Sequence, residues 1–216
     1  MTFALLAGVT VLAGCSTSST EAAHANTVQP TDTAAASAPS VSVEPTAAPE
    51  IVDPAAALNG ALDALGTTYH FTTTASVDGA TLVVADGDRV GDGTRLEISQ
   101  GDASVSYVIL PAGTWVKPGD GEWEQVETTA TSDPIDALRT PKSVSVPPDG
   151  AGDVLVVSVP GVALGIPGDD LVDVQVTLSG NAIVSLGYVT TIDGRSAEVR
   201  AVLGPAIDTN PVSPPI

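Results

Sequence analysis

The stretch TYHFTTTASVDGATLVVA, residues 68–85, carries the clearest fold signal in the chain. Large side chains recur at every second position, so Tyr69 and Phe71 are predicted to share one face of an extended strand. Asp78-Gly79 is typical of the two-residue turn that joins antiparallel strands. The residues that follow this turn predict a second strand over Ala80–Ala85. The stretch is therefore predicted to form a β-hairpin.

The same alternation continues toward the C-terminus, with short turn-like sequences such as Asp86-Gly87 between the predicted strands. These further strands are predicted at Thr94–Ser99, Ser104–Leu110, Thr114–Lys117, Trp123–Val126, Val154–Val159, Leu171–Leu178, Ile183–Thr191 and Ala197–Leu203. The segment Val162–Pro167 is a candidate for a helical turn.

Two helices are predicted from their capping sequences. Asp53 is an N-cap candidate, Pro54 suits the first helical position, and the Ala/Leu run that follows ends at Gly66. Asp133-Pro134 opens a second, short helix through about Arg139 by the same logic. Runs of strands interrupted by two helices predict an α+β fold that is mostly antiparallel β, with a curved sheet and helices on one face.

The N-terminal residues are typical of a bacterial lipoprotein signal. The apolar run Phe3–Leu12 is only half as long as a membrane-spanning helix requires. It ends in Leu12-Ala13-Gly14-Cys15, which resembles the lipobox, whose cysteine receives a diacylglyceryl group before cleavage on its N-terminal side. Cys15 is the only cysteine, and nothing around it could form a core. We expect Cys15 to be lipidated with fatty chains such as palmitate.

The domain organisation follows from composition. Residues 1–14 are predicted to be the signal peptide, and residues 15–52, which are rich in Ser, Thr, Ala and Pro, a lipidated disordered tether. Residues 53–208 are predicted to be the β-rich domain, and residues 209–216 a disordered tail. We expect the domain to be monomeric, outside the cytoplasm, and held at the cell membrane by its lipid anchor.

The charge balance excludes some classes of partner. The chain has 7 basic and 26 acidic residues, which gives a net charge of −19. Nucleic acids and anionic lipid surfaces are bound by clusters of Lys and Arg, so neither is an expected partner. Attachment to the membrane is therefore expected to come from the lipid anchor.

One stretch carries a family resemblance. Tyr107–Trp123, read as YVILPAGTWVKPGDGEW, followed by Asp133-Pro134, resembles the LppX/LprG-type lipoproteins of mycobacteria and their relatives. A lipobox, a low-complexity tether, an Ala/Leu helix and a strand with His70-Phe71 come in the same order in that family. The resemblance implies a LolA-like fold, which is a bent antiparallel half-barrel with helices on its concave face. It also implies an apolar cavity that holds acyl chains of envelope lipids. The chain departs from the family in having few aromatic residues and a shorter domain, which would make such a cavity small.

No residue pattern predicts catalysis. His70 is the only histidine of the domain, no nucleophile-elbow sequence accompanies it, and its predicted place on an outward strand face favours a structural role. Asp169-Asp170 could serve acid–base chemistry, but a solvated loop is the simpler interpretation in so acidic a chain. Trp115 and Trp123 could stack on sugars, although hairpin tryptophans more often cover the end of a sheet core.

The run Asp86–Glu97 is the best candidate for a metal site. It has Asp at loop positions 1 and 3, Gly at position 6 and Glu at position 12, as a calcium loop requires. Val90 occupies position 5, where an oxygen ligand belongs, so a solvated turn with acidic flanks is the preferred interpretation. We therefore predict no metal, no cofactor and no catalytic residue.

Three functions compete on this basis. The preferred hypothesis is a cell-envelope lipoprotein that binds or carries a lipid or other hydrophobic ligand. The alternative is a non-enzymatic interaction or sensor domain that contacts a protein or cell-wall partner. An envelope hydrolase has the least support, because no nucleophile–base pair is visible in the sequence.

Overall fold

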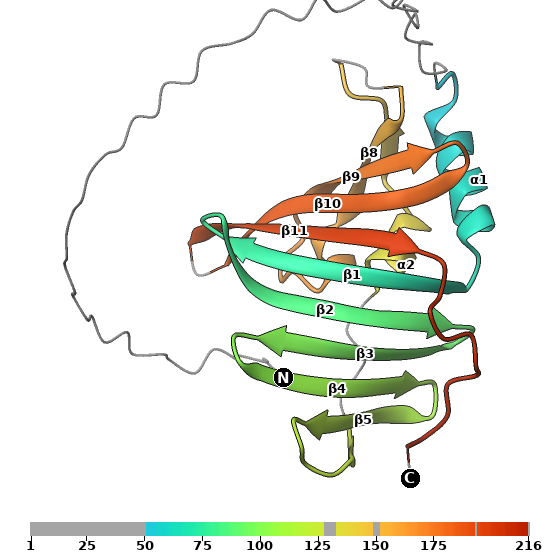
Figure 1. Cartoon of the computed structure of the whole chain (residues 1–216). Coiled ribbons are helices and arrows are strands. Elements are labelled where there is room, and N and C mark those ends of the chain that lie inside the picture. Colours follow the sequence, from blue (N-terminus) through green and yellow to red (C-terminus); the bar gives the residue numbers. More distant parts are fainter. Residues whose placement is uncertain (1–50, 128–132, 149–151, 193, 216) are drawn as a thin grey trace, which may run out of the picture. The chain divides into compact units, whose positions relative to one another are not determined.

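The computed structural model describes residues 51–127, 133–148, 152–192 and 194–215, in which eleven strands form one antiparallel sheet (Figure 1). The strands are β1 (Thr68–Val77), β2 (Ala80–Val90), β3 (Gly93–Gln100), β4 (Ala103–Leu110), β5 (Gly113–Pro118), β6 (Glu124–Val126), β7 (Ser143–Ser145), β8 (Val154–Pro160), β9 (Leu171–Ser179), β10 (Ala182–Ile192) and β11 (Arg195–Gly204). The prediction of a mostly antiparallel β fold with few helices is confirmed.

The sheet consists of two meanders that meet in its middle. Its strand order is β6-β5-β4-β3-β2-β1-β11-β10-β9-β8-β7, so each strand lies beside its sequence neighbour except where β1 pairs with β11. That pairing runs from His70 opposite Gly204 to Val77 opposite Ala197. The strands β6 and β7 form the two free edges, and the sheet is therefore open.

The first predicted helix is confirmed as α1 (Pro54–Leu65). The Asp53 side chain caps its first turn by accepting a hydrogen bond of 3.0 Å from the backbone N–H of Ala56. Gly66 ends the helix with a positive φ of 65°, a backbone conformation that glycine adopts without strain. Leu58 and Leu62 are buried, and α1 contacts β10 and β7.

The second predicted helix is confirmed as α2 (Pro134–Leu138). The chain passes through α2 on its way from edge strand β6 to edge strand β7. Ile135 and Leu138 are fully buried, because α2 packs on β8 and on the 3₁₀ turn η1 (Gly161–Leu164). The helical turn predicted over Val162–Pro167 overlaps this 3₁₀ turn only at its first three residues.

A single apolar core joins both helices to the sheet. Its fully buried members on the sheet come mainly from β8, β9 and β10, where Val- and Leu-rich strands alternate inward and outward residues. The largest fully buried side chains are Leu58, Ile135, Leu138, Leu155, Leu186, Val157, Val159, Val174 and Val176. This half of the sheet is therefore the packed half of the domain.

One turn prediction was wrong, the strand before that turn was predicted too short, and one strand was missed. Asp78-Gly79 forms the predicted hairpin turn, with positive φ values of 51° and 80°. Asp86-Gly87, predicted to be a turn, instead lies inside β2, because both residues are paired with β1 on one side and β3 on the other. The predicted strand over Ala80–Ala85 therefore extends to Val90. The strand β7 was not predicted because it has only three residues.

The C-terminal residues also differ from the prediction. Residues 209–216 were expected to be a disordered tail, but the described part, residues 209–215, continues from β11 past the ends of β2–β5 (Figure 1). The side chain of Arg95 donates a hydrogen bond of 2.6 Å to the backbone carbonyl of Asn210. Val212 packs so closely on β3 that a Cβ on Gly93 would lie 2.6 Å from the Val212 Cβ. We call residues 205–215 the C-terminal strap.

The predicted signal peptide, Cys15 and the tether up to residue 50 lie outside the described residues. Ile51, assigned to the tether, packs half-buried against the core, whereas Val52 is exposed. Within the described part of the chain, no helix is long and apolar enough to cross a membrane.

Candidate ligand-binding cavity

A cavity of about 490 Å³ lies between the central strands of the sheet and the beginning of α2. Most of its lining side chains are apolar, and the charged ones come from the end of β2, the turn after it and the first turn of α2. The lining residues are Tyr69, Phe71, Thr73, Ala85, Arg89, Asp92, Thr94, Leu96, Ile98, Ile109, Asp133, Pro134, Ile135, Asp136, Leu186, Ala201 and Leu203. Specific small-molecule sites have volumes of about 300–1,000 Å³, so this cavity is within the useful range.

The pairing register gathers these side chains on one face of the sheet. Phe71 of β1 lies opposite Leu203 of β11 and Gly87 of β2, and Gly87 in turn lies opposite Leu96 of β3. Because directly opposed residues point to the same face, these four positions form one row across the sheet. The alternation predicted from the sequence for Tyr69 and Phe71 is what places both on the cavity face.

Gly87 brings two strands unusually close between the lining residues Phe71 and Leu96. A Cβ on Gly87 would lie 2.6 Å from the Cβ of Leu96 and would also collide with the backbone carbonyl of Arg95. Any larger residue at position 87 would therefore force β2 and β3 apart. Glycine here permits close strand packing at an ordinary negative φ, so its role is steric.

A hydrogen-bonded cluster closes the polar end of the cavity. The Tyr69 hydroxyl donates to Asp133 Oδ2 at 2.6 Å, and Arg89 Nη1 donates to the same oxygen at 2.7 Å. Arg89 Nη1 also donates to Asp136 Oδ2 at 3.1 Å. The other Asp133 oxygen caps α2 by accepting from the backbone N–H of Ile135 at 2.9 Å. The cluster thus ties β1 and β2 to the first turn of α2.

The cluster fixes the charge states of its members. Burial, the nearby charge of Asp133 and the hydrogen bond to it raise the pKa of Tyr69 well above its ordinary value, so the hydroxyl stays neutral. Burial opposes the charge of Arg89, but hydrogen bonds to Asp133 and Asp136 outweigh this effect and raise its pKa. Arg89 is therefore a permanent cation, and its charge is compensated within the cluster.

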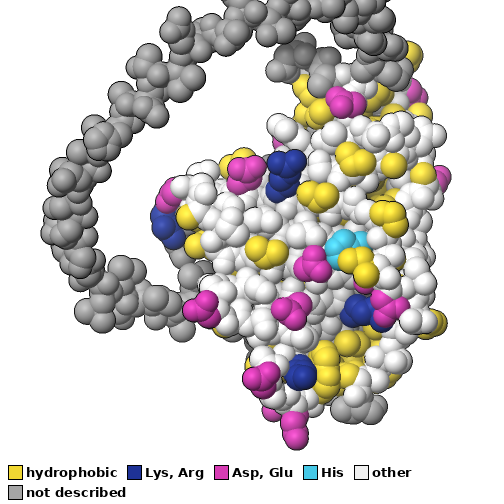
Figure 2. Space-filling view, in the orientation of Figure 1, with side chains coloured by type: hydrophobic (Ala, Val, Ile, Leu, Met, Phe, Trp, Pro, Cys, Tyr) yellow, Lys and Arg dark blue, Asp and Glu magenta, His cyan; other side chains and the backbone are white. Residues whose placement is uncertain are grey.

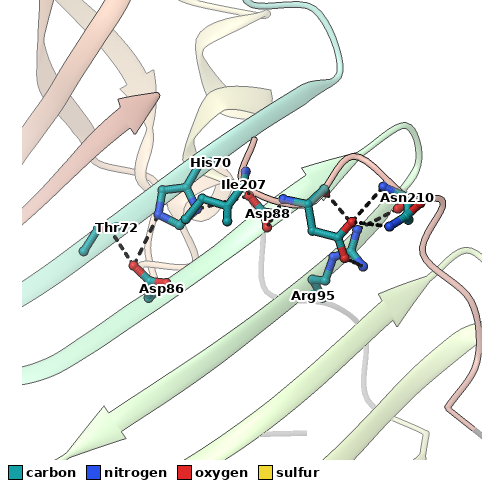
Figure 3. Close-up of polar contacts among 8 residues, drawn as sticks. His70, Thr72, Asp86, Asp88, Arg95, Ile207 and Asn210 are labelled. Carbon is teal, nitrogen blue, oxygen red and sulfur yellow. Dashed lines mark hydrogen bonds and ion pairs between the residues drawn. The ribbon is translucent and has the colours of Figure 1, made fainter. Parts of the chain in front are cut away.

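A second polar network lies on the opposite face of the sheet, where Figure 3 shows His70 between two aspartates. His70 Nδ1 lies 3.1 Å from Asp88 Oδ1, and His70 Nε2 lies 3.3 Å from Asp86 Oδ2. Thr72 donates a hydrogen bond of 2.8 Å to Asp86. Figure 2 displays the same face, with the histidine among acidic and hydrophobic side chains.

Asp88 attaches the C-terminal strap to this face (Figure 3). Its carboxylate accepts hydrogen bonds from the backbone N–H groups of Ile207 at 2.9 Å and Asp208 at 3.2 Å. Burial opposes the ionisation of Asp88, but the bonds from Ile207, His70 and Asp208 outweigh it and lower its pKa. Arg95 completes the attachment with an ion pair of 2.8 Å to the Asp208 carboxylate. This network therefore holds the C-terminal strap against β2 and β3.

The geometry of the Asp86–Glu97 run is that of a hairpin and does not fit a calcium loop. Asp86 lies opposite Glu97 in the β2–β3 register, and Asp86 and Asp88 are already bonded to other side chains and to the strap. Gly91 occupies the turn between the strands, with a positive φ of 62°. In the described residues, no three His, Cys, Asp or Glu side chains are grouped as a metal site requires.

The other sequence candidates do not converge on the cavity. Trp115 is only 5% exposed and pairs with Val108, on the face away from the cavity, so it has no surface for stacking on a sugar. Trp123 is half-buried just before β6. Asp169-Asp170 is exposed in the turn before β9. Cys15, the predicted lipidation site, lies outside the described residues.

Comparison with known proteins gives no further guide, because the sequence matches no model of a known protein family and no curated protein at a significant level.

The cavity residues Arg89 and Asp136 were not singled out from the sequence. Asp133 was recognised as a helix cap, but its bond to Tyr69 joins residues that are 64 positions apart. No local pattern signals such a contact.

Proposed function

We propose that this protein is a membrane-anchored cell-envelope lipoprotein whose β domain binds or carries a hydrophobic ligand. The observation that carries the proposal is the cavity of about 490 Å³ with mostly apolar walls. A site of this size, with an apolar body and a few polar groups at one end, is what small hydrophobic or amphiphilic ligands require. A filled and dry interior would instead have favoured the interaction or sensor hypothesis.

The position of the cavity supports a LolA-like arrangement, in which a bent half-barrel sheet carries helices on its concave face. Phe71 and Leu203 contribute to the cavity from adjacent central strands, and Ile135 contributes to it from α2. In such an arrangement the ligand lies between sheet and helix. This is the place that the resemblance to LppX/LprG-type lipoproteins implies.

The lipid anchor completes the proposal. Two fatty chains on Cys15 would hold the chain at the extracytoplasmic face of the membrane, because each buried methylene adds about 0.8 kcal/mol. A Cys15→Ser variant is expected to leave the membrane fraction, and unchanged sedimentation with membranes would contradict the anchor. An anchored domain with an apolar cavity would work close to a supply of hydrophobic molecules.

The binding function is tested with the neutral fluorophore N-phenyl-1-naphthylamine. The full-length chain carrying Cys15→Ser can be purified without detergent, and we expect the dye to bind it with about one-to-one stoichiometry and enhanced fluorescence. Mass spectrometry of organic extracts of the same protein should detect a copurified hydrophobic compound. Absence of both dye binding and extractable compound would overturn the proposal.

A further inference from the structure

The charged groups of the cavity are unevenly distributed. All four charged lining residues lie at its polar end, and they comprise one guanidinium, Arg89, and three carboxylates, Asp92, Asp133 and Asp136. We call this group the acidic rim. The rest of the lining is apolar except for two threonines, so a ligand head group has no other charged partner in the described lining.

The charge of Arg89 is already balanced by carboxylates, and only its Nη2 has no partner among the described residues. Its Nη1 donates to Asp133 at 2.7 Å and to Asp136 at 3.1 Å, and its Nε donates to the backbone carbonyl of Gly91 at 3.4 Å. An anionic head group that used Nη1 would have to displace a carboxylate that is tied to the Tyr69 hydroxyl and to the cap of α2, which leaves Nη2 as its only point of approach to Arg89. It would also enter beside carboxylates of its own charge, which is unfavourable.

Asp92 adds a second uncompensated negative charge to the acidic rim, because Asp133 and Asp136 share the single positive charge of Arg89. Asp92 lies in the turn between β2 and β3, is exposed, and has no hydrogen bond or ion pair to the described part of the chain. Outside the lining, Arg139 approaches Asp136 only at 3.7 Å and is itself well exposed. The acidic rim therefore keeps a negative excess, and the net charge of −19 over the whole chain adds to it.

The apolar walls near the acidic rim include the half-buried aromatic ring of Phe71. Aromatic faces attract ammonium groups through the ring quadrupole, and carboxylates attract them by charge. Both features lie at one cavity whose remaining walls suit an aliphatic chain. We propose that the cavity binds single-chain amphiphiles with a cationic head group more tightly than those with an anionic head group. This proposal rests on the proposed function.

The test uses three ligands with the same ten-carbon chain and different head groups. Decyltrimethylammonium, decanol and decanoate compete with N-phenyl-1-naphthylamine for the full-length Cys15→Ser chain at low ionic strength, below their micelle concentrations. We expect decyltrimethylammonium to bind at least tenfold more tightly than decanoate, with decanol between them. Equal or tighter binding of decanoate would overturn the selection but leave the cavity function intact. Failure of the dye and of all three ligands to bind would overturn the proposed function itself.

A matched pair of variants tests whether the acidic rim causes the preference for a cationic head group. Asp92→Asn removes the free carboxylate of the acidic rim, and we expect it to weaken decyltrimethylammonium binding several-fold while decanol binding is unchanged. Asp102→Asn removes another exposed carboxylate at the other end of β3, about 25 Å away at about 3.3 Å per strand residue. We expect Asp102→Asn to bind all three ligands like the parent chain. Equal effects of the two substitutions would mean that net charge alone sets the preference, which would overturn a role for the acidic rim.

Discussion

Arg89 of β2 and Asp133 at the start of α2 are joined by a hydrogen-bonded ion pair of 2.7 Å that spans the polar end of the cavity. The two side chains are only 21% and 24% exposed, so water screens the pair incompletely. The pair therefore couples the position of α2 to the sheet, and the cavity depends on that position.

Replacing Arg89 should destabilise the fold. Arg89→Met leaves two carboxylates without their common donor, and the expected loss in the free energy of unfolding is about 1.5–3 kcal/mol, the range for charged hydrogen bonds. Urea denaturation measures it. Arg195→Met is the matched control, because its contact with Asp78 is exposed and 3.7 Å long, and it should leave stability unchanged. Equal effects of the two substitutions would contradict the role given to Arg89.

Tyr69 should titrate later than an ordinary tyrosine. Because its pKa is raised in the folded state, the unfolded chain releases this proton first as pH rises. The neutral hydroxyl therefore contributes stability that is present below about pH 10 and is lost above it. The slope of unfolding free energy against pH in this range should be shallower in Tyr69→Phe. An identical slope in the parent chain and the variant would exclude Tyr69 as its source.

Both α-helices of the described residues and most of the strands could be predicted from the sequence, because caps, turns and alternating side chains within each segment specify them. Asp53-Pro54 and Asp133-Pro134 start helices through their own caps, and Asp78-Gly79 makes its own turn. The Asp86-Gly87 prediction was wrong because the same dipeptide chemistry was overridden by pairing with β1 and β3. Propensity is a weak guide where a residue lies between two partner strands.

The cavity and the C-terminal strap could not be predicted in the same way. Asp88 accepts hydrogen bonds from the backbone N–H groups of Ile207 and Asp208, which are 119 and 120 positions away in the sequence. No sequence pattern near position 207 predicts this contact. The pairing of β1 with β11, which joins the two meanders, likewise connects segments that are far apart in the sequence. Alternation placed Tyr69 and Phe71 on one face, but only the pairing of distant strands gave that face its walls.

The strap should be released when Asp88 is neutralised. Asp88→Asn leaves one side-chain acceptor oxygen for two backbone N–H groups, so faster hydrogen exchange is expected at Ile207 and Asp208. Asp86→Asn, which changes the neighbouring and far more exposed carboxylate, should leave exchange at both amides unchanged. Unchanged exchange in Asp88→Asn would mean that other contacts hold the strap.

The same carboxylate predicts a pH dependence. Because the pKa of Asp88 is lowered below its ordinary value of 3.8, ionised Asp88 contributes stability at neutral pH that is lost as pH falls from about 4 through the folded-state pKa. In Asp88→Asn, part of the acid destabilisation of the parent chain should be missing. Denaturation at several pH values between 6 and 3 measures the difference, and parallel curves would argue against this source of stability.

Because β2 and β3 lie so close together at position 87, any substitution that adds a Cβ there should destabilise the fold. Gly87→Ala introduces a Cβ at 2.6 Å from the Leu96 Cβ, and strain of this kind costs about 1–3 kcal/mol. Gly187→Ala on β10 is the control, because its Cβ would meet its nearest atom, the Val199 carbonyl oxygen, only at 3.4 Å. We expect the control to be neutral or slightly stabilising in thermal unfolding. A harmless Gly87→Ala would contradict the close spacing of β2 and β3 at this position.

The central claim, that the cavity is a ligand site, is tested most directly by filling it. Ala85 is half-buried and lines the cavity, whereas its neighbour Val84 is half-buried on the opposite face of β2. Dye affinity is measured for Ala85→Phe and Val84→Phe in the full-length Cys15→Ser chain, with circular dichroism to verify folding. We predict that Ala85→Phe weakens N-phenyl-1-naphthylamine binding at least tenfold and that Val84→Phe leaves it unchanged. Undiminished binding by a folded Ala85→Phe chain would contradict the assignment of this cavity as the binding site.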